Sequence, residues 1–159
     1  MGIEQFNLIT DRSANDVALW RDLRNKGWLK MTSAERAKWE SHMKGAYNYT
    51  DLNRVGAALN YVRDRLAESG FLSASAFSAK VDWTAGDTPT KADLTKYLGH
   101  VSTIRGAFAQ RPTTPAAPTG RLTYREANDI EKIILDVDSL LTNMVAARFF
   151  SGELYSGEV

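Results

Sequence analysis

The sequence predicts an all-α bundle of four or five helices followed by a non-helical, extended or hairpin C-terminal arm. Two observations predict the helices: five short capping motifs, and apolar residues that recur every three or four positions after them. A third observation, turn-forming residues that alternate with aromatic ones near the end of the chain, predicts the arm. We expect a helical bundle domain over residues 1–148 and the arm over residues 149–159.

The five capping motifs each begin with Ser, Thr or Asn and carry an acidic residue three positions later. The first side chain can accept a hydrogen bond from an unpaired backbone N–H, and the acid can bond back to the capping residue near the positive end of the helix dipole. One such motif is weak evidence, but five that precede helical spacing indicate real helix starts. The motifs begin at Ser13, Thr32, Asn48, Thr90 and Thr123.

Three of the segments that follow these starts carry a long apolar stripe on one helical face. The segment after Asp16 fits this spacing only in part. We therefore expect the three striped helices to form the core. The stripes are Leu52, Val55, Leu59, Val62 and Leu66; Leu94, Tyr97, Leu98, Val101, Ile104 and Phe108; and Ile130, Ile133, Ile134, Val137, Leu140, Leu141 and Met144.

Two connectors separate the predicted core helices. The segment 70–89 is long for a loop, and long loops often carry function. We favour a packed connector in which Phe77, Val81 and Trp83 tuck under the bundle. The proline-rich linker at about residues 109–122 contains three prolines, which forbid a regular helix and predict an extended spacer between antiparallel helices.

The arm contains the triplet Ser-Gly-Glu twice, from Ser151 and from Ser156. The five-residue spacing fits no helix face, and an isolated hairpin is marginal in water. We expect its apolar side chains to need cover from the bundle or from a neighbouring subunit. Those side chains include Phe149, Phe150, Leu154 and Tyr155.

Composition excludes several classes of function. Twenty basic residues oppose nineteen acidic ones, for a net charge of +1, so no nucleic-acid partner is expected. Cysteine is absent and there are only two histidines, which excludes disulfides and thiolate sites and argues against a histidine metal cage. No apolar run approaches the roughly 18 residues that span a bilayer. The N-terminus lacks a signal-peptide pattern, which does not by itself fix a compartment, and we expect no membrane partner.

No constellation of residues predicts chemistry. His42 and His100 have no specified nucleophile or carboxylate beside them, and we interpret both as partly buried histidines bonded to backbone carbonyls. Asp136 and Asp138 diverge by about 200° on a helix, so we interpret them as solvated positions that flank the buried Val137. We expect no catalytic residues, no bound metal and no cofactor, and therefore no enzyme.

The aromatic residues are the remaining candidates for binding. We assign Trp20, Trp28 and Trp39 to one end of the core. For the others, packing and binding both stay open, because exposed rings can stack on sugars or anchor a protein interface. The candidate interaction residues are Trp83, Tyr47, Tyr49, Phe150, Leu154 and Tyr155.

Several strings of the sequence resemble a group of small prophage-encoded proteins of Gram-positive gut and clostridial bacteria. The resemblance extends over most of the chain, and the strings that carry it are spread along it. They are residues 26–28, 31–35, 43–55, 81–84, 89–90, 97–98 and 122–133, together with the terminal Ser-Gly-Glu pair. Members look like structural proteins of phage tails or baseplates, so the resemblance implies synthesis in the bacterial cytoplasm and a location in the virion tail. It carries no known catalytic or binding residues.

These observations lead to three expectations about function. The preferred one is a structural or interaction module of a phage or prophage tail, whose partners are other phage structural proteins or further copies bound through the arm. The alternative is a module that binds bacterial cell-surface glycan through Trp83, Tyr47 and Tyr49. A small enzyme is disfavoured, and would require a deep pocket that places His42 or His100 beside a carboxylate.

Overall fold

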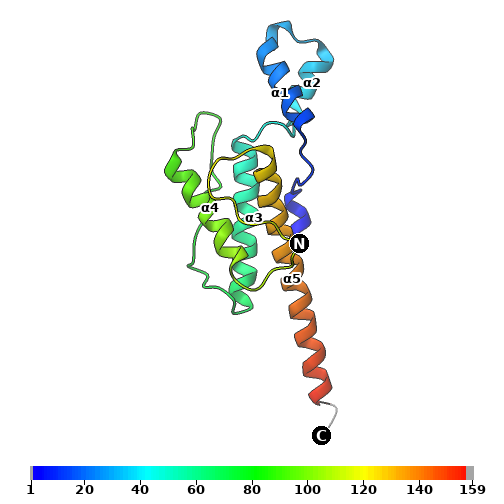
Figure 1. Cartoon of the computed structure of the whole chain (residues 1–159), viewed down its shortest axis with the longest axis vertical. Helices are drawn as coiled ribbons and strands as arrows, with labels where there is room; N and C mark the ends of the chain where they lie inside the picture. The colour runs from blue at the N-terminus through cyan, green and yellow to red at the C-terminus, as the bar shows by residue number, and fades with distance from the viewer. Residues whose placement is uncertain (1, 157–159) are drawn as a thin grey trace.

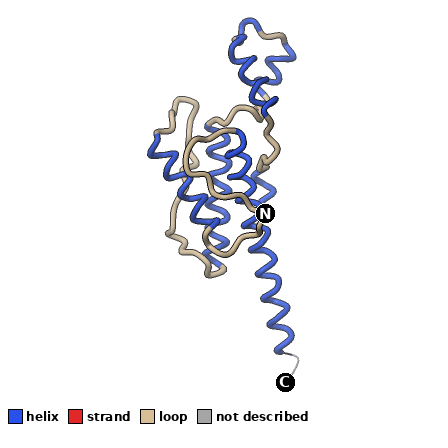
Figure 2. The backbone as a smooth tube through the Cα atoms, viewed as in Figure 1, coloured by secondary structure: helices blue, strands red, loops and turns tan. Residues whose placement is uncertain are grey.

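The structure, a computed structural model, describes residues 2–156, with side chains described as far as Arg148. Within this range the chain forms five α-helices and two short 3₁₀ helices, and no strand (Figure 2). The predicted all-α class and the number of helices are confirmed.

Three helices form the bundle: α3 (Tyr49–Glu68), α4 (Lys91–Arg105) and α5 (Tyr124–Ser156) (Figure 1). The 3₁₀ helix η1 (Ile3–Phe6) packs against α3, where the ring of Phe6 meets that of Tyr61. The apolar stripes predicted from the sequence supply the core. Its fully buried side chains are Val55, Ala58, Leu59, Val62, Leu66, Val101, Ile104, Ile130, Ile133, Ile134, Val137 and Leu141.

The other two helices form a separate hairpin beyond one end of the bundle (Figure 1). Helix α1 (Ala14–Lys26) pairs with α2 (Ser33–Glu40) through the 3₁₀ helix η2 (Trp28–Lys30). The hairpin buries only Leu23 and Met31 among its apolar side chains.

The assignment of three tryptophans to the core is wrong, because they lie in this hairpin. The side chain of Trp28 is 44% exposed and packs under the guanidinium of Arg36. Trp20 and Trp39 are half-buried and lie outside the core of the bundle.

All five predicted helix starts are confirmed by hydrogen bonds. Ser13, Thr32, Asn48 and Thr90 each form a complete capping box with the acid three residues later. At the start of α5, Glu126 accepts from the backbone N–H of Thr123 at 2.8 Å, and the hydroxyl of Thr123 accepts from the N–H of Arg125.

The long connector between α3 and α4 is packed along α3. The side-chain amide of Asn60 donates to the carbonyl of Ala79 at 3.0 Å and accepts from its N–H at 2.8 Å. The amide of Asn53 does the same with Trp83, at 2.9 and 2.8 Å. Between them, a Cβ atom at Gly56 would lie 2.6 Å from the carbonyl oxygen of Lys80, so only glycine allows this approach. The packed-connector prediction is confirmed for Phe77, which is half-buried, but Val81 is 45% exposed.

The proline-rich linker between α4 and α5 has no regular helix, as predicted. It is fixed to both neighbours. The guanidinium of Arg105 donates to the carbonyl of Pro115, and the buried Thr114 donates its hydroxyl proton to Asp136 at 2.8 Å.

Helix α5 is traced as far as Ser156, inside the segment for which the sequence predicts a non-helical arm. In Figure 1 it continues well past the ends of α3 and α4. The side chains from Phe149 onward and the whole of residues 157–159 lie outside the described residues. The arm, with Phe150, Leu154 and Tyr155, therefore stays a prediction.

Candidate functional site

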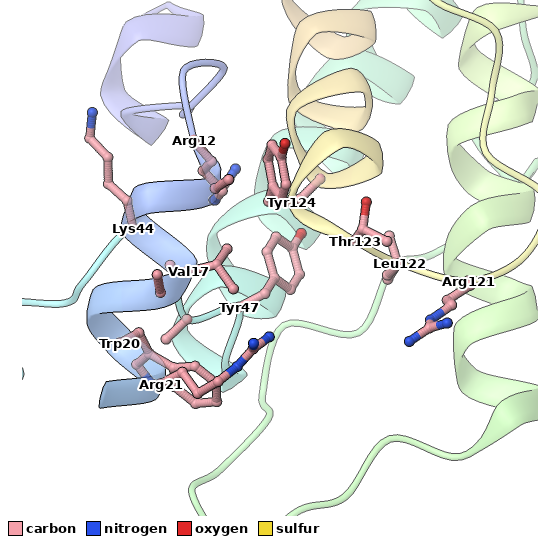
Figure 3. Close-up of a pocket in the computed structure, with 15 residues that line it drawn as sticks. Arg12, Val17, Trp20, Arg21, Lys44, Tyr47, Arg121, Leu122, Thr123 and Tyr124 are labelled. Carbon is pink, nitrogen blue, oxygen red and sulfur yellow. The ribbon is translucent and has the colours of Figure 1, made fainter. Parts of the chain in front are cut away.

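A pocket of about 550 Å³ lies between the hairpin and the bundle. Its walls come from three parts of the chain: the first two turns of α1, the segment 44–47 that leads into α3, and the segment 121–124 that opens α5 (Figure 3). Arg12 and Tyr47 line it where the hairpin joins the bundle.

A buried ion network lies behind the pocket. Glu131, on the core face of α5, is fully buried and accepts hydrogen bonds from two arginines. Its Oε1 lies 2.7 Å from an Nη atom of Arg12, and its Oε2 lies 2.7 Å from an Nη atom of Arg54. A buried carboxylate is tolerated when it is paired and hydrogen-bonded in this way.

Asp51 completes the network and balances its charge. Besides capping α3, it lies 2.8 Å from Arg54 and 3.5 Å from Arg12. Burial acts to lower the pKa of Arg54, but its hydrogen bonds to Glu131 and Asp51 outweigh burial and raise the pKa above the ordinary value. Capping alone therefore does not explain Asp51, because two cations and two carboxylates share one site.

The backbone on both sides of the hairpin is fixed at this network. The side-chain amide of Asn128 donates to the carbonyl of Arg12 at 2.9 Å and accepts from its N–H at 3.0 Å. The guanidinium of Arg12 lies over the ring of Tyr47, 5.3 Å from the ring centre, and the Tyr47 hydroxyl meets that of Tyr97 at 2.5 Å. Burial, foremost, raises the pKa of both phenols above the ordinary value.

Gly45 allows the segment before α3 to contact the start of α1. A Cβ atom there would lie 2.0 Å from the backbone oxygen of Asp16. Because real Cβ atoms do not approach backbone this closely, any other residue would push the hairpin away and change the wall of the pocket.

The charged side chains that line the pocket are all basic. Four basic residues line it and no acidic residue does; the four are Arg12, Arg21, Lys44 and Arg121. Arg12 is neutralised by the network, and Lys44 pairs with Asp11 at 2.6 Å. Within the described part of the chain, Arg21 and Arg121 make no ion pair, hydrogen bond or ring contact.

The acidic residues at the starts of α1 and α5 accept hydrogen bonds from their own helix caps. Asp16 accepts from the backbone and hydroxyl of Ser13, and Glu126 accepts from those of Thr123. These hydrogen bonds, led by the one from the cap hydroxyl, hold the pKa of both carboxyls below the ordinary range. They do not neutralise the two free arginines, and the pocket keeps an excess of positive charge.

The structure separates the aromatic residues predicted for binding. Tyr47 lines the large pocket, but Tyr49 lies outside it and is 38% exposed. Trp83 is half-buried in a smaller hollow of about 220 Å³ beside α4, where the Nζ atom of Lys80 lies 4.2 Å from its ring centre. Tyr47, Tyr49 and Trp83 therefore do not form one stacking surface.

Both histidine interpretations need correction. His42 is exposed and adopts a left-handed backbone conformation, with φ 56°, just after α2. His100 is half-buried against Phe77, with the ring centres 4.5 Å apart and nearly parallel. Burial, foremost, lowers the pKa of His100. Among the described residues neither histidine bonds to a backbone carbonyl, because His42 faces solvent and His100 makes a ring stack instead.

The prediction that Asp136 and Asp138 are solvated is also wrong. Asp138 is buried and forms an ion pair with Arg65 of α3. Asp136 is partly buried and accepts from Lys132 at 2.9 Å and from Thr114. The two side chains do diverge, as predicted, but each finds a partner on a different neighbouring segment.

The pocket offers positive charge and ring surface, without a carboxylate or imidazole base in its lining. This arrangement is suited to binding an anion. Among the described residues, no group of three or more His, Asp or Glu is placed to hold a metal ion. Sequence reasoning missed Arg21 and Arg121, because only folding brings α1 and the segment before α5 together.

No protein-family model, curated protein or solved structure matches this chain. Across the helices that the structure describes, none combines the length and apolar character needed to cross a membrane.

Proposed function

We propose that this protein is a non-enzymatic structural or interaction module of a phage or prophage tail. The sequence strings that resemble prophage-encoded tail proteins supply the context. The observation that carries the proposal is the shape: a three-helix core with two projections, the α1–α2 hairpin at one end and the continuation of α5 at the other (Figure 1).

This shape suits a protein that joins neighbours rather than one that encloses a substrate. The last described side chain that packs against the core from α5 is Val145, whereas Ala146, Ala147 and Arg148 are exposed. The residues that follow include Phe150, Leu154 and Tyr155. In a tail, where many copies lie side by side, a contact that is weak in an isolated pair becomes stable by repetition.

Truncation after Arg148 tests the interaction role. We expect the full chain to self-associate as its concentration rises, and the truncated chain to stay monomeric with an unchanged circular dichroism spectrum, because the core lies within α3, α4 and the first half of α5. Light scattering after size-exclusion chromatography measures the mass. A monomer at all concentrations for both chains would contradict self-association through this segment.

A pair of substitution variants refines the test. Changing Phe150, Leu154 and Tyr155 to serine should abolish association, and the control Ser151→Ala should retain it. The tail location is tested separately, by mass spectrometry of purified particles from a lysogen that carries the gene. Particles that contain tail proteins but lack this chain would contradict the location.

A second candidate function is binding of bacterial surface glycan. Tyr49 keeps an exposed ring, and Trp83 presents part of its ring beside Lys80. A glycan array tests it: signal that is lost in the Tyr49→Ala and Trp83→Ala variants supports the candidate, and an array without signal removes it.

A further inference from the structure

The pocket between the hairpin and the bundle has a charge that nothing within the described chain neutralises. Of its four cations, Arg12 faces the carboxylates of Glu131 and Asp51, and Lys44 faces Asp11. The guanidinium groups of Arg21 and Arg121 remain, and both line the opening (Figure 3). Two unit charges are therefore available to a ligand.

The two arginines come from different parts of the fold. Arg21 lies on α1, and Arg121 precedes the cap of α5, so they border the opening from opposite walls (Figure 3). Planar guanidinium groups bind phosphate through paired N–H···O hydrogen bonds, and they retain their charge at any physiological pH. A phosphate that enters the opening therefore meets a guanidinium group on either wall.

The remaining lining is apolar or aromatic. Val17 and Trp20 of α1 face Leu122 and the ring of Tyr47 across the pocket (Figure 3). Arg24 lies over the ring of Trp20, 5.3 Å from its centre, which holds the indole at the wall. A volume of about 550 Å³ lies in the range of ordinary small-molecule sites, which is roughly 300–1,000 Å³.

A buried polar atom also stays unsatisfied beside the pocket. Arg12 is 5% exposed, and its Nε has no hydrogen-bond partner in the described structure, although both of its Nη atoms donate hydrogen bonds. Buried donors without partners are uncommon in folded proteins.

We infer that this pocket binds a phosphate monoester carried on a ring, such as a sugar phosphate or a mononucleotide. A phosphate monoester carries about 1.5 to 2 negative charges near pH 7, which matches the two unpaired guanidinium groups, whereas a carboxylate supplies only one. The ring occupies the apolar part between Trp20 and Leu122. The site is independent of the proposed tail function.

Calorimetric titration of the full chain with four probes tests the inference. Glucose 6-phosphate and adenosine monophosphate carry both a phosphate group and a ring. Glucose carries the ring alone, and inorganic phosphate carries the phosphate alone. Binding of either ring phosphate, tighter than that of glucose and of inorganic phosphate, supports the site, and the tighter of the two ring phosphates identifies the source. Absence of binding by both ring phosphates, or equal binding of glucose, would overturn it.

A charge-matched pair of variants places the binding in this pocket. The double variant Arg21→Gln with Arg121→Gln should weaken binding by about tenfold or more, because it removes both free guanidinium groups. The control, Lys30→Gln with Arg111→Gln, removes the same charge from exposed positions outside the pocket and should change affinity by less than about twofold. Equal losses in both pairs would show unspecific attraction and contradict the inference.

Discussion

The bundle and the hairpin begin their helices in the same way but are held together differently. Ser13 and Thr32 cap the hairpin helices with complete capping boxes, as Asn48 and Thr90 do in the bundle. Yet α3 alone buries seven residues, whereas α1 buries one and α2 none. Capping fixes where a helix starts, but burial of apolar surface decides whether helices form a stable unit.

The hairpin compensates through polar anchors at its base. Arg12 and Tyr47 lie on the two chain segments that connect the hairpin to the bundle. The guanidinium of Arg12 contacts the ring of Tyr47 and forms an ion pair with the buried carboxylate of Glu131. The junction therefore depends on charge and hydrogen bonds where the bundle depends on packing.

The largest effect is expected for Glu131→Ala. The substitution leaves Arg12 and Arg54 with Asp51 as their one shared carboxylate, and breaking a buried ion pair costs about 3–5 kcal/mol of unfolding free energy. Urea denaturation followed by circular dichroism measures the loss. Glu68→Ala, at an exposed acid at the end of α3, is the control and should stay within about 0.5 kcal/mol. A loss below about 1 kcal/mol for Glu131→Ala would show that the network does not support the fold.

A leucine in each region gives the next contrast. Leu59 is fully buried in α3, and Leu59→Ala should cost about 2–5 kcal/mol through lost contacts and a residual cavity. Leu29, at the hairpin turn, is 89% exposed, and Leu29→Ala should stay within about 0.5 kcal/mol. The same denaturation experiment compares them. Similar losses for the two would mean that the hairpin contributes a packed core after all.

The smallest effect is expected from pH. The cap carboxyls of Asp16 in the hairpin and Asp93 in the bundle have a pKa below the ordinary 3.8, caused first by the hydrogen bond from the cap hydroxyl and then by that from its backbone N–H. Groups with a lowered pKa contribute stability above their unfolded pKa, and lose it as pH falls through the folded value.

Protonation of the cap carboxyls should therefore cost both regions helix stability only below about pH 4, in thermal melts followed at 222 nm. Tyr47 and Tyr97 act with the opposite sign. Since burial raises the pKa of both phenols, their contribution is present below pH 10 and is lost as pH rises further. The lowered pKa of His100 by itself costs stability as pH falls below the ordinary 6.5, so the cap assignment is tested in the variant His100→Phe. Melting temperatures of this variant that fall steadily between pH 7 and 5 would contradict the assignment to cap carboxyls.

Local sequence signals predicted the helices well, because capping and periodicity act within one turn or one face. The starts at Ser13, Asn48 and Thr90, and the buried stripe that includes Val55 and Ile133, agree with the structure. These features depend on residues three to seven positions apart, which the sequence displays directly.

The sequence did not reveal the site, because its parts are joined only by folding. Arg12 and Glu131 are separated by 119 positions, and Arg21 and Arg121 lie in segments with no shared pattern. The same reason explains the wrong interpretation of Asp138, whose partner Arg65 lies on another helix. The prediction that Trp28 lies in the core was wrong because a short hairpin has too few neighbouring side chains to bury a tryptophan.

Native-state hydrogen exchange followed by mass spectrometry tests the central claim most directly: that packing holds α3, α4 and α5 together as one unit, and that the α1–α2 hairpin is attached through polar anchors. We expect amides at the core positions of the three bundle helices to exchange slowly, with an opening free energy equal to that of global unfolding. Amides in α1 and α2 should exchange faster, through a local opening of smaller free energy. Equal protection in the hairpin and the bundle, lost together in a single transition, would contradict it.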